Sequence, residues 1–221
     1  MTKIADSRRK PLGGEQLVTK QQGKACMTLY EPEIIVQEAL DTGHIEKGRS
    51  RLDAWQANQP VTLHTLNVLR YSRHELGQYQ EAIVAVRAMI ELRPVDACER
   101  ISDHICLGKL YVGTKELSKA WDALNVVLNW PGLKAWYPFG LVRSAVELAL
   151  DICAAAKSNQ ELSEKAFETA VALIDDGCST SCSILKKAQD CAKRLGRNAL
   201  HERFESAVHR DLRTLQRMLD T

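Results

Sequence analysis

The 221-residue chain lacks long apolar runs and has no excess of either charge. No stretch approaches the roughly 20 apolar residues that a helix needs to span a bilayer, and the first residues lack the apolar centre of a secretory signal. Thirty Lys and Arg residues against 28 Asp and Glu residues leave a formal charge of +2, which is too small for a dedicated nucleic-acid binder. These absences predict a cytoplasmic protein without a membrane span, for which nucleic acid is an unexpected partner.

Catalytic and metal-binding motifs are also missing, since the sequence contains no HExxH, GxSxG, Walker or GxGxxG pattern. Cys178, Cys182, Cys191 and His201 suggest a zinc site, but Cys182 and Cys191 lie nine residues apart on one expected helix and so point in opposite directions. We therefore expect free thiols, no metal, no cofactor and no enzymatic activity. An active site built from dispersed residues would leave no such pattern and stays an alternative.

What the sequence does contain is a repeat with a period of 34 residues. The recurring pairs of positions are Gly43 and Gly77, Ile45 and Tyr79, Gly48 and Ala82, and Pro60 and Pro94. A helical hairpin of this length cannot bury its apolar face alone, so successive copies share one core. The period predicts an all-α solenoid of helical hairpins.

From Tyr30 onward the pattern resembles the tetratricopeptide repeat, in which small and large residues alternate at fixed positions of two antiparallel helices. The second unit matches best, with Leu69 in its first helix, Gly77 in the turn and Ala82 in its second helix. It departs from the family pattern at Arg70, which takes the place of a small residue.

Two further units follow. The third repeats the second with a displacement of 38 residues, and its LGKLY and LSKAW stretches resemble the two helices of the family. The fourth is displaced from the third by 46 residues, after the insertion WPGLKAWYPFG. Because small residues allow close helix packing, we expect Gly108 to face Ala120 and Ala154 to face Ala166.

The resemblance implies a right-handed solenoid of about four repeats at residues 29–177, between a flexible basic tail at 1–28 and capping helices at 178–221. We expect the final helix to cover the last repeat with one apolar stripe. That stripe includes Phe204, Val208, Leu212 and Leu215. The alternative is a dimer formed through the C-terminal helix.

The function that the resemblance implies is non-catalytic binding of a protein or peptide, as an adaptor, a chaperone or a subunit of a larger assembly. In tetratricopeptide proteins the first helix of each repeat lines most of the concave groove. The register places in this partner-binding groove the side chains of Asn67, Tyr71, His74, Ser102 and Lys109.

Two other hypotheses concern different parts of the chain. Trp136, Tyr137 and Phe139 in the insertion either fill the junction between the third and fourth units or form an aromatic anchor for a partner, because aromatic residues are common at interface hot spots. An RNA-associated helical-repeat factor is the alternative function, since residues 3–24 and 186–197 are basic. Such RNA readers need base-reading side chains at matching repeat positions, and here those positions differ between units.

Overall fold

The computed structural model describes residues 31–133, 140–178 and 180–219. The chain divides into two compact units, one up to Gln59 and one over Pro60–Thr221. Within the described ranges the regular structure is helical, without strands, and no helix is both long enough and apolar enough to cross a membrane. The tail at 1–28 and the anchor residues Trp136, Tyr137 and Phe139 lie outside these ranges, so both hypotheses stay predictions.

The first unit contains a helical hairpin formed by residues 31–42 and α2 (Ile45–Gln56). Ile35 and Leu52, one from each helix, are almost completely buried. Arg51 and Glu38 form an ion pair between the same two helices. This hairpin corresponds to the first repeat of the 34-residue pattern.

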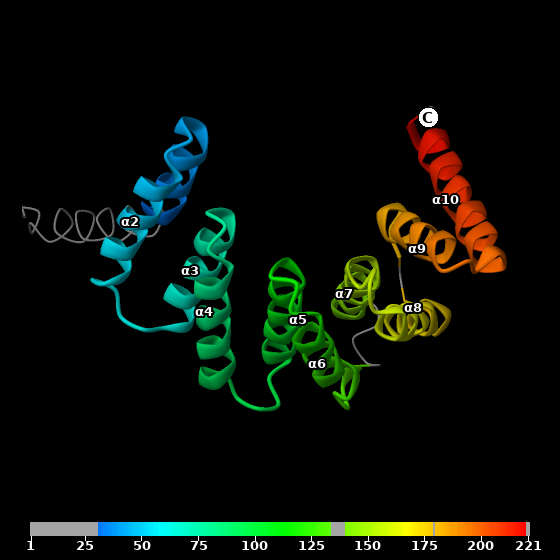
Figure 1. Ribbon diagram of the computed structural model, residues 1–221, viewed down its shortest axis with the longest axis horizontal. Coiled ribbons are helices and arrows are strands. Elements are labelled where there is room, and N and C mark those ends of the chain that lie inside the picture. The colour runs from blue at the N-terminus through cyan, green and yellow to red at the C-terminus, as the bar shows by residue number, and fades with distance from the viewer. Residues whose placement is uncertain (1–30, 134–139, 179, 220–221) are drawn as a thin grey trace, which may run out of the picture. The chain divides into compact units, whose positions relative to one another are not determined.

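In the described part of the second unit, the helices follow one another as hairpins (Figure 1). They are α3 (Leu63–Glu75) with α4 (Tyr79–Leu92), α5 (Cys98–Gly113) with α6 (Leu117–Leu128), α7 (Leu141–Ala155) with α8 (Gln160–Asp175), and α9 (Cys182–Arg194) with α10 (Asn198–Leu219). The two helices of each hairpin pack together, α5 also packs on α7, and α7 packs on α9. This side-by-side stacking of first helices confirms the predicted solenoid of helical hairpins.

Several helices of the compact unit Pro60–Thr221 end with the same backbone hydrogen bonds. A turn residue donates its N–H to the carbonyl three residues earlier, and the next residue donates to the carbonyl five residues earlier. The turn residues are Gly77, Lys115, Gly177 and Gly196. This geometry needs the left-handed backbone region, with φ of +70° at Gly77 and +63° at Lys115. The spacing of Gly43 and Gly77 therefore reflects a left-handed turn residue that recurs in the hairpin turns at Lys115 and Gly196, but not in the turn between α7 and α8.

The third and fourth hairpins pack closely at Gly108 in α5. A Cβ atom added to Gly108 would lie 2.5 Å from Cδ2 of Leu148 in α7, so glycine is what allows these two helices to approach. The nearest atoms to this Cβ position belong to the next hairpin, and the expectation that Gly108 faces Ala120 stays a prediction. Ala82, Ala120 and Ala166 in the second helices are completely buried.

The expected partnership of Ala154 and Ala166 is wrong, because Ala154 is exposed near the C-terminal end of α7. The displacement of 46 residues came from matching second helices, and the insertion does not shift the first helix by the same amount. Leu141, the first residue of α7, follows Cys98, the first residue of α5, by 43 residues.

A buried ion pair joins the second and third hairpins at the end of α4. Arg93 Nε lies 2.5 Å from Asp103 Oδ2 in α5, and the Asp103 side chain is only 7% exposed. Arg100 Nη1 donates a hydrogen bond of 3.2 Å to the carbonyl oxygen of Arg93. Both contacts fix the connection between α4 and α5.

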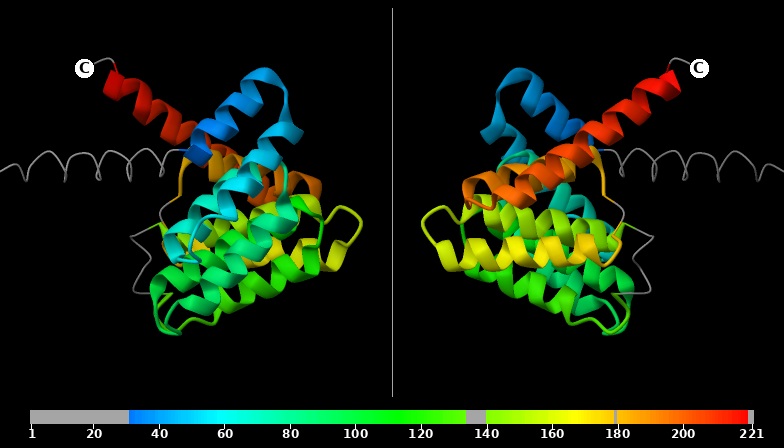
Figure 2. Two further views of the ribbon diagram at one scale, coloured as in Figure 1. Left: turned by 90° about the vertical axis from the view of Figure 1, so that its left-hand side faces the viewer. Right: turned by 90° about the vertical axis from the view of Figure 1, so that its right-hand side faces the viewer.

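The C-terminal hairpin differs in detail from the expected one. The first of the two helices expected at 178–221 is α9, which begins at Cys182 with Ser181 as its N-cap. In α10, Phe204 is 1% exposed and belongs to the core, whereas Leu212 is 49% exposed. Figure 2 shows the C-terminal part of α10 extending past the helices beside it. The side chain of Leu215 lies outside the described part of the chain.

Replacing Lys115 by Gly should stabilise the protein, because a residue with a side chain pays about 1 to 2 kcal/mol to adopt the left-handed backbone region. Glycine gives the unfolded chain more conformational entropy, but this offsets only part of that gain. We expect the free energy of unfolding to rise by roughly 0.5 to 1 kcal/mol in denaturant titrations. Lys157→Gly is the matched control, since Lys157 is an exposed turn lysine without a positive φ. A Lys115→Gly variant no more stable than the unmodified protein would contradict this assignment.

Phe204→Ala should lower the free energy of unfolding by about 3 to 5 kcal/mol, as expected for truncation of a buried phenylalanine. Leu212→Ala should change it by no more than about 0.5 kcal/mol, because that side chain is half exposed. Thermal unfolding measures both effects, and sedimentation of the two variants tests the alternative. A Leu212→Ala variant that converts a dimer to a monomer would show that α10 is a dimer contact rather than a cap.

Candidate functional site

The five predicted groove residues lie on the first helices of two successive hairpins. Asn67, Tyr71 and His74 belong to α3, and Ser102 and Lys109 belong to α5. All are exposed except Asn67, which is partly buried. We call the face formed by the exposed side chains of α3, α5 and α7 the helix-A face.

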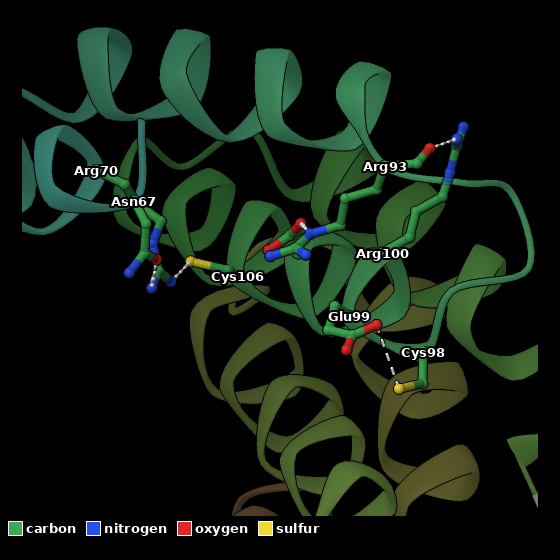
Figure 3. Close-up of polar contacts among 8 residues, drawn as sticks. Asn67, Arg70, Arg93, Cys98, Glu99, Arg100 and Cys106 are labelled. Carbon is green, nitrogen blue, oxygen red and sulfur yellow. Dashed lines mark hydrogen bonds and ion pairs between the residues drawn. The ribbon is translucent and has the colours of Figure 1, made fainter. Parts of the chain in front are cut away.

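Arg70 connects α3 to α5 on this face (Figure 3). Its Nη2 donates to Oδ1 of Asn67 at 2.8 Å, and its Nη1 donates to Sγ of Cys106 at 2.6 Å. Its guanidinium carbon lies 3.9 Å from the centre of the Tyr71 ring. Burial opposes ionisation, but the contacts with Cys106 and Tyr71 outweigh it and raise the pKa of Arg70. A charged guanidinium therefore positions both Asn67 and Tyr71.

A second group of contacts connects α5 to α7. Lys109 Nζ lies 3.0 Å from Oε2 of Glu147, and Glu147 and Ser102 line a cavity of about 460 Å³. The cavity is lined by Cys98, Glu99, Ser102, Gly140, Leu141, Arg143, Ser144 and Glu147. It therefore lies between the N-terminal halves of two neighbouring first helices.

The cavity carries both signs of charge and several hydrogen-bonding groups. Hydrogen bonding from the Glu99 backbone N–H and from the Cys98 thiol holds the pKa of the Glu99 carboxyl below its ordinary value. Partial burial and the adjacent Glu99 carboxylate raise the pKa of the Cys98 thiol, which stays protonated at neutral pH. With the exposed guanidinium of Arg143 and the hydroxyl of Ser144, the cavity suits a polar ligand group rather than an apolar one.

His74 lies apart from these two groups, at the end of α3 near the hairpin turn. Its Nδ1 is 3.2 Å from Oε1 of Glu75, and its ring packs edge to face with Tyr79 at a centroid distance of 5.4 Å. The structure thus brings Asn67 and Tyr71 together through Arg70. Lys109 pairs with Glu147, which lines the same cavity as Ser102.

Sequence reasoning missed Cys106, Arg143 and Glu147 as members of this face and treated Arg70 only as a departure from the repeat pattern. Glu147 follows Lys109 by 38 residues, which is the displacement between the second and third units. This agreement is no guide to Glu147, because α7 begins 43 residues after α5 and the contact therefore joins non-equivalent positions of the two helices.

The basic segment 186–197 makes contacts within the chain itself. Lys187 Nζ is 2.7 Å from Oδ1 of Asp151, and Arg197 Nη2 is 3.3 Å from Oε1 of Glu168. Arg194 Nη2 donates to the carbonyl oxygen of Cys153 at 2.6 Å. As for metals, no three His, Cys, Asp or Glu side chains gather as potential ligands within the described ranges.

Comparison with known proteins identifies relatives by structure but not by sequence. No family model and no curated protein matches the chain. A candidate kinesin light chain from Podosopora anserina with nearly identical TPR-like repeats aligns over 86% of this chain and 97% of its own, with a TM-score of 0.57 and 14% identity. A point variant of that protein aligns over 86% of this chain and 96% of its own, with a TM-score of 0.58 and 14% identity. The chain has the fold of the tetratricopeptide-like helical-repeat proteins.

Proposed function

We propose that this protein is a non-catalytic interaction module that binds a segment of a protein partner along the helix-A face. The observation that carries this proposal is the polar cavity of about 460 Å³ between α5 and α7. It lies on the same set of first helices as the exposed Tyr71 and Lys109. A pocket next to exposed aromatic and charged side chains is typical of a recognition surface.

The dimensions of this face suit a short peptide segment. Packed helices lie about 8 to 10 Å apart, and α5 and α7 pack in this way. With α3, which Arg70 links to α5, they present a surface at least roughly 20 Å across. An extended chain covers that distance with about six residues, at roughly 3.3 Å per residue. We infer that one polar side chain of the segment enters the cavity while another contacts Tyr71.

Contacts within the chain favour a protein partner over RNA. Lys109, Lys187 and Arg197 each form an ion pair with a carboxylate of the same chain. Cations held in this way have a weaker attraction for phosphate than a continuous basic stripe. Binding to protein is also the general role implied by the repeat architecture, in which the partner decides whether the module serves as an adaptor, a chaperone or an assembly subunit.

The combined substitution of Asn67, Tyr71 and Lys109 by Ala should abolish partner binding without unfolding the protein. Loss of a Tyr hot spot alone costs about 2 kcal/mol, or roughly thirtyfold in Kd. The measurement is affinity capture from nuclease-treated extracts of the native cell, with the captured proteins quantified by mass spectrometry. Circular dichroism checks that the helical content is unchanged.

The matched control replaces Glu81, Val84 and Asp122 by Ala, which are exposed residues of the second helices α4 and α6. This variant should capture the same proteins as the unmodified chain. Undiminished capture by the helix-A variant would move the binding site elsewhere. Loss of all partners on nuclease treatment would favour the RNA-associated function instead.

A further inference from the structure

A buried polar cluster joins three helices in the C-terminal half of the compact unit Pro60–Thr221. It consists of Cys153 on α7, Ser163 on α8, and Cys191 and Arg194 on α9. Cys153 and Ser163 are completely buried and Cys191 is 4% exposed. The helix-A face does not use any of these side chains.

The two cysteines lie on turns of α7 and α9 that face each other, because α9 packs on α7. Cys191 Sγ is 3.8 Å from the carbonyl oxygen of Leu150, and Arg194 Nη2 is 2.6 Å from the carbonyl oxygen of Cys153. Residues three apart share one side of a helix, so these two contacts align one turn of α9 with one turn of α7. This alignment places the Cys191 thiol near enough to the Cys153 sulfur for the two groups to titrate as a pair.

The polar neighbours favour a thiolate at Cys153. Arg194 Nη2 lies 3.1 Å from Cys153 Sγ and 2.7 Å from Ser163 Oγ, and Ser163 Oγ lies 3.5 Å from the same sulfur. Hydrogen bonds from Cys191 and Ser163 and the charge of Arg194 lower the pKa of Cys153 to about 6 despite its burial. The contact with Cys153 and burial raise the pKa of Cys191, so the pair holds one thiolate and one thiol.

A cavity borders this cluster at Arg194. It has a volume of about 430 Å³ and is lined by Lys157, Gln160, Arg194 and Leu195. The guanidinium of Arg194 connects the cavity to the thiolate, since its Nη2 contacts Cys153 Sγ. A small oxidant in the cavity therefore lies beside Arg194 and Lys157, whose positive charges stabilise a departing anion, and only the Arg194 side chain separates it from the buried Cys153 sulfur.

We propose that Cys153 and Cys191 are a redox-active dithiol that hydrogen peroxide converts to a disulfide between α7 and α9. The Cys153 thiolate attacks one peroxide oxygen, so that an S–O bond forms, the O–O bond breaks and hydroxide leaves. Hydroxide takes the proton of Cys191, whose sulfur then attacks the Cys153 sulfenic acid. The S–S bond forms, the S–O bond breaks and the second oxygen leaves as water once protonated. The two cysteines lose two electrons and the peroxide gains two.

The disulfide would link two hairpins that otherwise contact only through side chains and packing. It closes a loop between residues 38 positions apart, which restricts the unfolded chain more than the folded one. Oxidation should therefore raise the Tm of the C-terminal half without changing the helix-A face of α3 and α5.

The test treats the reduced full-length protein with equimolar hydrogen peroxide, blocks the remaining thiols by alkylation and maps the peptides by mass spectrometry without reduction. We expect a cross-linked peptide pair that contains Cys153 and Cys191 and has lost two hydrogen atoms. Cys153→Ser and Cys191→Ser should each remove the cross-link, and Cys106→Ser, on the helix-A face, should retain it. Arg194→Gln should slow its formation at least tenfold.

The mapping on the unmodified chain keeps the proposal falsifiable even where a serine variant folds poorly. Oxidation at the partly exposed Cys98 and Cys182, with no link between Cys153 and Cys191, would overturn the proposal. An Arg194→Gln variant that forms the cross-link as fast as the unmodified protein would overturn the role of the guanidinium.

Discussion

The close contact of α5 and α7 at Gly108 is the constraint on which the candidate site between these two helices depends. The absent side chain leaves room for Leu148, whose Cδ2 occupies space that a Cβ would need. Lys109 follows Gly108 in the sequence, and Glu147 precedes Leu148. Because the two helices approach this closely, Lys109 Nζ reaches Glu147 Oε2 at 3.0 Å. The same pair of helices forms the polar cavity towards their N-terminal ends. Packing and the candidate site thus have a common geometric origin.

Each pair of neighbouring first helices also has its own polar contact, made by a different pair of residues. Arg70 donates to Cys106 between α3 and α5, Lys109 pairs with Glu147 between α5 and α7, and Lys187 pairs with Asp151 between α7 and α9. Apolar packing brings the helices together, and these contacts fix which side chains stay available on the surface. The repeats therefore share a backbone arrangement while each presents different chemistry, which suits recognition of one particular partner segment.

The sequence was sufficient to predict the repeating hairpins, because glycine in the turns and small residues in the second helices recur at a fixed spacing in the sequence. Gly43, Gly77 and the buried Ala82 follow that pattern. The contacts between hairpins could not be predicted in the same way, since they depend on how far each insertion displaces a first helix. Ala154 was misplaced for this reason. Arg70 and the cluster around Cys153 have no periodic signal, because each joins residues that are close only in the folded chain.

Thermal unfolding of Gly108→Ala, Leu148→Ala and the double variant tests the central claim most directly. An added methyl group at a packed position costs about 1 to 3 kcal/mol, whereas alanine in an unobstructed helix is more favourable than glycine by roughly 1 kcal/mol. The α5–α7 contact predicts that Gly108→Ala lowers the Tm of the unmodified chain but leaves unchanged or raises the Tm of the Leu148→Ala variant. An equal decrease in both backgrounds would contradict the claim that Leu148 occupies the space left by Gly108.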